Sequence, residues 1–503
     1  MPKNRILLVY PKLGMSGSLV RHLPLSLLYA AVDCLKNGYE IDILDIRLEP
    51  GHWRERLRQL LKADVLLVGI SVLTGSPIIN ALEISRLVKE VRPDLQVVWG
   101  GPHATFNSRE VLSEPSVDYV VSGYGSKSLW RLASHLNGDV GSASLAEIGG
   151  LSYRSQGQVV TVAPEPSFEL IDYRDIPYHL IEKDLDRYGQ LDSRQKIFPL
   201  YSALGCPYQC AFCSSPAQYR PMKVKYVTLP VAQVVDHIEF VNRVYGADYI
   251  YFIDDDSFVN LEHVDAVISE ITRRGINVKL GFRGARINEI MKMSDDFLNR
   301  LAKAGTDIMH IGAESGSQRI LDLINKNCTV DNIVEVNRKM ARHPEILAAY
   351  NWIVGLPGES CEDLRLSQQL MLKLVKENPR ALIFIPNKFR PLPGTKLYDL
   401  ALANGYQKPE RLEQWANTEA EGDYRAPWYS DEQAANIDMM QICSYFIDNK
   451  VFKVTVGNTF KYKLIKLAAK FYSPIARFRL KNGYSKYLIE NYIFRWAARR
   501  YQE

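Results

Sequence analysis

Two hydrophobic patterns alternate along the chain. Short unbroken apolar runs predict buried strands, and apolar residues three or four positions apart predict helices. The first part of the chain has five such runs, at Ile6–Tyr10, Ile41–Asp45, Asp64–Val72, Gln96–Trp99 and Tyr119–Ser122. Helical spacing lies between them, as over Pro24–Lys36 and Pro77–Val91. Strand and helix in this order predict a doubly wound, Rossmann-like parallel sheet.

The same alternation returns later in the chain. Six more apolar runs occur, at Phe198–Ser202, Tyr249–Ile253, Lys279–Arg283, Ile308–Gly312, Tyr350–Val354 and Leu382–Ile385. Small and polar residues follow each run, which predicts a partial (β/α)6 barrel with its chemistry at the carboxyl ends of the strands. Between the two α/β patterns, turn residues predict a hairpin and linker. We therefore expect an α/β fold in four parts: 1–145, 146–195, 196–415 and a helical 416–503.

Cysteine usage and apolar runs bound the class of protein. A chain of 503 residues predicts two or three domains. Three of its seven cysteines cluster and four are scattered singly, so no disulfide framework is visible. Scattered free thiols favour a reducing, cytoplasmic compartment. The N-terminal apolar run is too short for a signal peptide, and no run reaches the length of a membrane span.

The C-terminal region is basic, unlike the rest of the chain. From Lys450 to the end there are 13 Lys and Arg against two Glu, whereas the whole chain has a net charge of +5. Two basic amphipathic helices are predicted, Phe460–Tyr472 and Tyr487–Arg500, the first with apolar residues at Leu464, Leu467, Ala468 and Phe471. Such helices fit either a membrane surface or a cap docked on the barrel. No recognition module accompanies the charge, so nucleic-acid binding is not expected.

Three cysteines form the strongest chemical motif. Cys206, Cys210 and Cys213 have the spacing Cys-x3-Cys-x2-Cys directly after the first barrel strand. A structural zinc site usually has four protein ligands, and no fourth Cys or His lies nearby. Three thiolates on a [4Fe–4S] cluster would leave one iron open to another ligand. A redox disulfide or an incomplete zinc site is the alternative interpretation.

With Phe212 before the last cysteine, this motif resembles that of the radical S-adenosylmethionine (SAM) enzymes. The resemblance implies that the open iron chelates SAM and that the barrel loops hold the rest of it. It assigns the SAM site to Phe212, Asp254, Asp255, Arg283, Glu314, Ile353 and Gly355. Arg286 is an alternative to Arg283 as partner of the SAM carboxylate, because Arg binds carboxylates through two parallel hydrogen bonds. Asp254–Asp256 could instead be a metal site or helix cap, and Glu314 a cap.

The loops after the first set of strands resemble those of the cobalamin-binding domain that precedes the barrel in many radical SAM enzymes. The residues concerned are Ser71, Leu73, Thr74, Gly75, Gly100, Gly101, His103 and Gly123. Glycine at such turns lets the backbone approach a large flat ligand. Two departures stand out. The Asp-x-His-x-x-Gly signature is absent, so no histidine ligand to cobalt is expected, and Gly123–Ser126 differs from the Gly-Glu-Gly-Glu that the family often has.

The resemblance as a whole implies a cobalamin-dependent radical SAM methyltransferase. One SAM would supply a methyl group by way of methylcobalamin, and a second would give a 5′-deoxyadenosyl radical that activates a carbon centre of a small or lipid-like metabolite. An external electron donor of the flavodoxin or ferredoxin type is implied. A cyclase or oxidoreductase without methyl transfer shares every motif and stays open. A non-enzymatic iron–sulfur electron carrier or cobalamin sensor is the third hypothesis.

Overall fold

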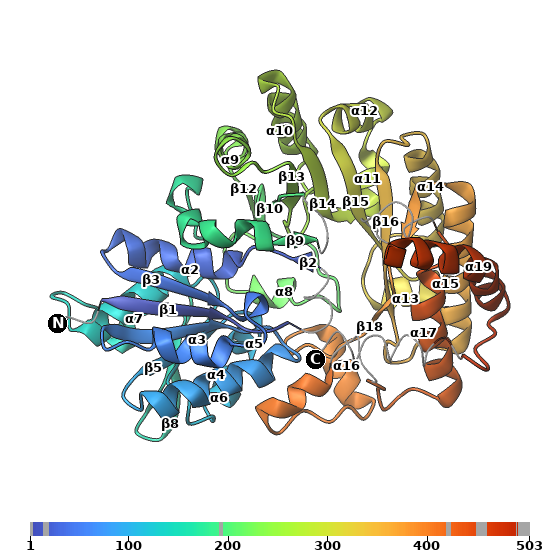
Figure 1. The fold of residues 1–503 in the computed structure, drawn as a ribbon. Helices are drawn as coiled ribbons and strands as arrows, with labels where there is room; N and C mark the ends of the chain where they lie inside the picture. The colour runs from blue at the N-terminus through green and yellow to red at the C-terminus, as the bar shows by residue number, and fades with distance from the viewer. Residues whose placement is uncertain are drawn as a thin grey trace. The chain divides into compact units, whose positions relative to one another are not determined.

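A computed structural model describes residues 4–13, 20–190, 195–418, 424–448, 460–488 and 490. The chain divides into two compact units (Figure 1). Unit 1 comprises Met1–Leu191, Arg220–Val224 and Lys408–Gly422. Unit 2 comprises Asp192–Tyr219, Lys225–Gln407 and Asp423–Glu503. Among the described residues, each unit is built on its own seven-stranded sheet. The two separate sheets agree with the two α/β patterns of the sequence.

Unit 1 is a doubly wound sheet in the order β3-β1-β4-β5-β6-β7-β8. Its first five strands are parallel. They are β1 (Arg5–Tyr10), β3 (Glu40–Asp45), β4 (Val65–Ser71), β5 (Gln96–Gly100) and β6 (Tyr119–Val121). The strand order reverses between β1 and β4, and ligands of open α/β sheets bind beyond the carboxyl ends of the strands at such a switch point. The predicted Rossmann-like fold is confirmed.

Among the described residues of unit 1, six helices accompany the parallel strands. They are α2 (Leu25–Lys36), α3 (Trp53–Leu60), α4 (Pro77–Val91), α5 (Pro102–Phe106), α6 (Ser108–Val111) and α7 (Ser126–Asn137). Helix α2 packs on α7, and α3 packs on α4. Pro77 opens α4 at a position where its missing N–H has no intrahelical partner to lose. Gly138, with φ +71°, ends α7 in the left-handed conformation that glycine adopts without strain.

Segments beyond the parallel strands complete unit 1. The predicted hairpin is present as β7 (Leu151–Ser155) and β8 (Gln158–Thr161), which extend the sheet antiparallel to β6. Short strands β2 (Val20–Arg21) and β9 (Gly189–Gln190) pair with each other, and 3₁₀ segments η1 (Ile46–Leu48), η2 (Leu145–Glu147), η3 (Tyr173–Asp175) and η4 (Tyr178–Arg187) fill the connections. Segment η5 (Leu412–Thr418) packs on α4. Residues 408–415, which the sequence pattern assigned to the barrel, therefore group with unit 1.

Unit 2 contains six parallel strands in chain order, β10-β13-β14-β15-β16-β17. They are β10 (Ile197–Leu200), β13 (Tyr249–Phe252), β14 (Lys279–Arg286), β15 (Thr306–Glu314), β16 (Leu347–Val354) and β17 (Ala381–Ile383). Strand β18 (Asn387–Lys388) pairs with the end of β16, and β11 (Ala203–Gly205) with β12 (Tyr226–Thr228). An open parallel sheet of this order is the predicted partial (β/α)6 barrel.

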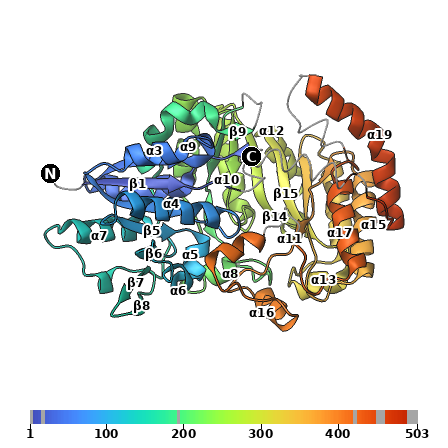
Figure 2. The same ribbon diagram turned by 60° about the horizontal axis from the view of Figure 1, so that its bottom comes forward.

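Helices connect the barrel strands (Figure 2). They are α8 (Ser215–Gln218), α9 (Val231–Tyr245), α10 (Leu261–Arg274), α11 (Ile287–Lys292), α12 (Asp295–Lys303), α13 (Gln318–Leu323), α14 (Val330–Ala341), α15 (Cys361–Glu377) and α16 (Lys396–Ala403). Side-chain caps start several of them, such as Asn260 on α10 and Ser360 on α15. Gly246 and Gly275, both at positive φ, end α9 and α10.

In the described part of the C-terminal region, helices α17 (Asp431–Ser444) and α19 (Phe460–Asn482) follow the barrel, as the sequence predicts. Helix α19 packs on α15 and α17 through Ala469, Ala476 and Leu480. The prediction placed an apolar side on Leu467, Ala468 and Phe471; the structure turns these three to solvent, because α15 and α17 take the opposite side. The Leu464 side chain and most of the predicted helix Tyr487–Arg500 lie outside the described residues.

Within the described ranges, no helix is both long and apolar enough to cross a membrane.

Candidate functional site

The three cysteines lie on a loop that is pinned at both ends. Strand β11 precedes the loop and pairs with β12, which fixes where the loop leaves the barrel. Within the loop, the Ala211 N–H donates to the Ile324 carbonyl at 2.9 Å, and the Ala211 carbonyl accepts from the Leu397 N–H at 3.1 Å. Backbone bonds to two other elements therefore hold the segment that carries Cys206, Cys210 and Cys213.

Asp254 anchors the start of this loop from the carboxyl end of β13. Its carboxylate accepts hydrogen bonds from the Ser202 N–H and Oγ, both at 2.7 Å, and from the Ala203 N–H at 3.1 Å. Burial raises the pKa of Asp254 to about 6, although the bonds from Ser202 and Ala203 oppose that rise. The side chain is 1% exposed, so these oxygens are committed to the cysteine loop. A contact between Asp254 and SAM stays a prediction.

The neighbouring Asp255 is exposed and ties a second segment to β13. It accepts from Ser215 Oγ at 2.8 Å and from the Tyr219 hydroxyl at 2.6 Å. Both donors belong to the turn and short helix α8 that follow Cys213. Asp254 and Asp255 thus hold the two ends of the same cysteine segment. Ser215 and Tyr219 could not be predicted from the sequence, because no characteristic spacing relates them to the three-cysteine motif.

Arg286 is the arginine that the structure brings to the cysteines. Its Nη1 lies 2.9 Å from Cys210 Sγ, and its Nη2 donates to the Lys326 carbonyl at 2.7 Å. The guanidinium carbon lies 4.0 Å from the centroid of the Tyr208 ring. The buried Nε has no hydrogen-bond partner among the described residues. The other predicted arginine, Arg283, is exposed on β14 and approaches Tyr201 and Tyr251 instead.

Glu314 and Lys326 form a buried ion pair beside the cysteine loop. Lys326 Nζ lies 2.7 Å from Glu314 Oε1, and the side chains are 6% and 8% exposed. The ammonium is also 5.9 Å from the centroid of the Phe212 ring. Gly312 makes room for the pair, because a Cβ there would lie 2.4 Å from both charged atoms. Burial lowers the pKa of Lys326, but the negative charges of the Glu314 carboxylate and a Cys210 thiolate outweigh this, so its pKa is raised.

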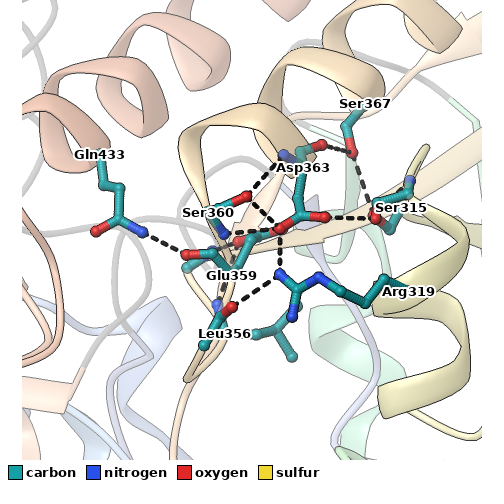
Figure 3. A network of polar contacts seen from close by, with 11 residues as sticks. Ser315, Arg319, Leu356, Glu359, Ser360, Asp363, Ser367 and Gln433 are labelled. Carbon is teal, nitrogen blue, oxygen red and sulfur yellow. Dashed lines mark hydrogen bonds and ion pairs between the residues drawn. The ribbon is translucent and has the colours of Figure 1, made fainter.

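Glu314 also begins a loop that polar contacts tie to α15 (Figure 3). Glu314 itself has φ +63°, a strained value for a residue with a side chain. Beyond it, Ser315 Oγ and the Gly316 N–H both contact Ser367 Oγ, at 3.2 and 2.8 Å. Ser317 Oγ donates to Asp363 at 2.5 Å. These bonds fix the backbone that presents Glu314.

The same helix holds the turn that follows β16. Asp363 accepts from the Ser360 N–H at 2.8 Å and pairs with Arg319, as the dashed lines in Figure 3 show. Glu359, just before α15, accepts from the Gly355 N–H at 2.5 Å. The two predicted SAM loops, after β15 and β16, are therefore braced against one helix start.

Gly355 has two reasons to be glycine. Its φ is +77°, and a Cβ there would lie 1.8 Å from the Tyr429 hydroxyl oxygen. Its carbonyl accepts from Trp428 Nε1 at 3.1 Å, so the segment with Trp428 and Tyr429 covers the turn. The described part of this covering segment begins at Tyr424. Ile353, the last residue but one of strand β16, is half-buried.

A pH-dependent stability follows from Glu359. Burial raises the pKa of this carboxyl to about 8, against the bonds from Gly355 and Leu356. The folded chain then holds a proton that the unfolded chain releases near pH 4.3, so stability is lost as pH rises through 8. We expect Glu359→Gln, which is uncharged at every pH, to lose about 3 kcal/mol less than the parent between pH 6 and 9. Chemical denaturation at both pH values measures this; the exposed Glu262→Gln should keep the parental profile, and equal losses in parent and Glu359→Gln would contradict the prediction.

In unit 1 the predicted cobalamin residues meet at the carboxyl edge of the parallel strands. Ser71 Oγ donates to Ser26 Oγ at 3.0 Å, and the Gly123 N–H donates to Thr105 Oγ1 at 3.2 Å. Gly101 has φ +89°, and a Cβ there would lie 2.8 Å from the Val72 carbonyl oxygen. Gly75 also has positive φ, Gly100 ends β5, and Leu73 is 39% exposed on the loop after β4. Tight glycine turns and an exposed apolar side chain fit a flat macrocycle.

His103 lies at this edge but its imidazole is fully buried. Nδ1 contacts Thr74 Oγ1 at 3.2 Å, and the ring packs edge-on against Trp415 with centroids 5.3 Å apart. Burial lowers the pKa of His103 to about 4, so the ring is neutral at pH 7. Trp415 is held in turn by Glu110, which accepts from its Nε1 at 2.6 Å. Trp415 could not be found from the sequence, because 305 residues separate it from Glu110.

The chemistry of the three thiols suits a cluster. Burial raises the pKa of Cys206 to about 12 and also raises that of Cys213, so loading must release protons. Within the described ranges, no three His, Cys, Asp or Glu side chains are arranged around a point that could hold a single metal ion. A [4Fe–4S] cluster makes a different demand, because each thiolate binds its own iron. Around the three cysteines lie Arg286, Lys326 and the carboxylates of Asp254 and Asp255.

Comparison with protein-family models finds two matches on this chain. The model of the radical SAM superfamily matches residues 200–370, which include the cysteine loop and the strands up to β16. The model of the B12 binding domain matches residues 16–133, which include the loops after β4, β5 and β6. Both predicted cofactor regions therefore fall inside the matching domain.

Curated relatives and solved structures agree. An uncharacterised methyltransferase of Pyrococcus horikoshii is 27% identical over 76% of this chain and 79% of its own length. The anaerobic magnesium-protoporphyrin IX monomethyl ester cyclase of Cereibacter sphaeroides is 28% identical over 77% of this chain, which spans 63% of the cyclase. OxsB, a cobalamin-dependent SAM radical enzyme solved with aqua-cobalamin and SAM, shares the fold with a TM-score of 0.71 and 16% identity, over 95% of this chain and 72% of its own. The chain belongs to the radical SAM enzymes that carry a cobalamin-binding domain, and uses a [4Fe–4S] cluster, SAM and cobalamin.

Proposed function

We propose that the protein is a methyltransferase that methylates a carbon centre of a small or lipid-like metabolite. The observation that carries this is the pairing, on one chain, of an anchored three-cysteine loop with a glycine-lined strand edge inside a B12 binding domain. The cluster and SAM together supply a radical that removes unactivated hydrogen, and cobalamin supplies a methyl carrier. The chain's own residues bind and orient the cofactors and the substrate, and they exclude water from the site.

The residue roles are part of this proposal. Cys206, Cys210 and Cys213 hold the cluster, and Asp254, the exposed Asp255 and the buried Glu314 face the SAM amino and ribose groups. Phe212, Ile353 and Gly355 line the adenine, with Arg283 or Arg286 opposite the SAM carboxylate. Support comes from the contacts of Cys210 with Arg286 and of Glu314 with Lys326, which gather these side chains around one loop. The cobalamin residues are Ser71, Leu73, Thr74, Gly75, Gly100, Gly101, His103 and Gly123.

Turnover products test the proposed reaction. The loaded enzyme, reduced and given SAM and a candidate substrate, is expected to form S-adenosylhomocysteine and 5′-deoxyadenosine in step with methylated product. 5′-Deoxyadenosine without S-adenosylhomocysteine would refute methyl transfer. Absence of both, with cluster and cobalamin bound, would support the electron carrier or sensor instead.

A cyclase or oxidoreductase without methyl transfer is the second candidate. It is favoured by the relative from Cereibacter sphaeroides, which carries the name of a cyclase and matches most of this chain. In both candidates the cluster needs one electron at a time, and we propose an external flavodoxin- or ferredoxin-type donor. A contact of the basic C-terminal helices with a membrane is the remaining proposed partner.

A further inference from the structure

Helix α19 has two apolar sides, of which the protein uses one. Ala469, Ala476 and Leu480 are buried at 0–3% exposure against α15 and α17. Leu467, Phe471, Ile475 and Phe478 are 52%, 72%, 50% and 59% exposed. At about 100° per residue, these four fall within about 80° of one another and opposite the buried side. Exposed apolar side chains usually occur singly on the surface of a soluble protein, so a stripe of four large ones marks an interaction surface.

Positive charge borders this stripe. Lys463, Lys470 and Lys481 are exposed, and the same 100° step places them together along one border of the apolar stripe. Helix α19 contains seven Lys and Arg and neither Asp nor Glu. The inner side packs on α15 and α17, and Arg479 ties the segment after the helix to it by donating to the Tyr484 and Lys486 carbonyls at 3.0 and 2.9 Å. The outer side is thus a fixed amphipathic surface.

We propose that this outer side of α19 lies on a membrane that contains anionic lipids. Phe471, Phe478 and Leu467 would enter the boundary of headgroups and acyl chains, and the bordering lysines would face lipid phosphates. A second copy of the chain fits less well, because two such stripes packed antiparallel would bring their lysine rows, of like charge, together. A protein partner would need a groove that is both acidic and apolar. All charged residues of α19 are Lys or Arg, which an anionic lipid surface matches without such a groove.

Vesicle flotation of the full-length protein tests this. Binding to vesicles with about one third phosphatidylglycerol is expected to exceed binding to pure phosphatidylcholine by about tenfold or more, and to weaken at about 0.5 M NaCl. Phe471→Ser with Phe478→Ser should reduce binding by about tenfold or more, because both side chains are mostly exposed and their loss removes apolar area only. Lys470→Ala with Lys481→Ala should weaken binding to the anionic vesicles alone.

Matched controls use exposed residues elsewhere on unit 2. Val244→Ser removes an exposed apolar side chain from α9, and Lys303→Ala removes an exposed lysine from α12; both should bind as the parent does. Equal binding to both lipids, or binding that Phe471→Ser with Phe478→Ser leaves unchanged, would overturn the proposal. Concentration-dependent self-association that this double variant abolishes, without vesicle binding, would assign the stripe to a second copy. The test needs no SAM, so its outcome is independent of the proposed reaction.

Discussion

Cys213→Ala is expected to abolish reductive cleavage of SAM, with 5′-deoxyadenosine falling to the level seen without enzyme. Three thiolates are the protein ligands available on this loop, and removing one leaves an iron without its anchor. Cobalamin binding should persist, because Cys213 belongs to unit 2 and the glycine loops after β4, β5 and β6 belong to unit 1. Iron and sulfide content, the cobalamin absorption spectrum and 5′-deoxyadenosine measure the three effects.

The matched control for this variant is another half-buried cysteine of the same unit. Cys361 lies at the first position of α15, outside the loop motif, and Cys361→Ala should keep the cluster and SAM cleavage. Survival of cleavage in Cys213→Ala would remove the basis for the cluster assignment. Loss of cobalamin together with the cluster would show that the two cofactor sites do not load independently.

The second large effect is expected from Lys326→Met. The substitution keeps most of the side-chain volume but leaves the Glu314 carboxylate buried without its partner, which costs about 3–5 kcal/mol. The free energy of unfolding should fall by that amount in chemical denaturation.

A double-mutant cycle separates the lost pair from a general packing defect. Lys326→Met with Glu314→Gln removes both charges and should recover part of the stability that Lys326→Met alone loses. Arg338→Met breaks an exposed ion pair with Glu377 and should change stability little, since solvent screens such pairs. If Lys326→Met proves as mild as Arg338→Met, the pair is not a structural element of the site.

Strand positions were predictable where burial on both faces gives an unbroken apolar run. The runs at Ile6–Tyr10 and Tyr249–Ile253 match β1 and β13 to within a residue at each end. The ends of β14 and β15 were placed too early, at Arg283 and Gly312, whereas the strands continue to Arg286 and Glu314. Polar residues at the functional end break the hydrophobic pattern while the backbone pairing goes on. The polar residues of the site are therefore the reason that the ends of β14 and β15 were predicted too early.

Contacts between distant residues could not be predicted. The sequence motifs located the cysteines and the carboxylates after β13. They did not show that the Asp254 carboxylate accepts hydrogen bonds from Ser202 and Ala203. Lys326 follows helix α13 with no local signal in the sequence, and only its ion pair with Glu314, at the end of β15, reveals its role. For α19, helical spacing identified an apolar side, yet which side packs depends on the surfaces of α15 and α17.

The return of residues 408–422 to unit 1 has a consequence for synthesis. Trp415, which covers His103, is made 305 residues after its hydrogen-bond partner Glu110. At about 5–20 residues per second, a ribosome needs about 15–60 seconds to cover that distance. Throughout this interval the nascent first unit has an uncovered flank beside the loop that carries His103. Chaperone binding to the nascent chain should therefore be strongest before residue 415 emerges and should fall after it.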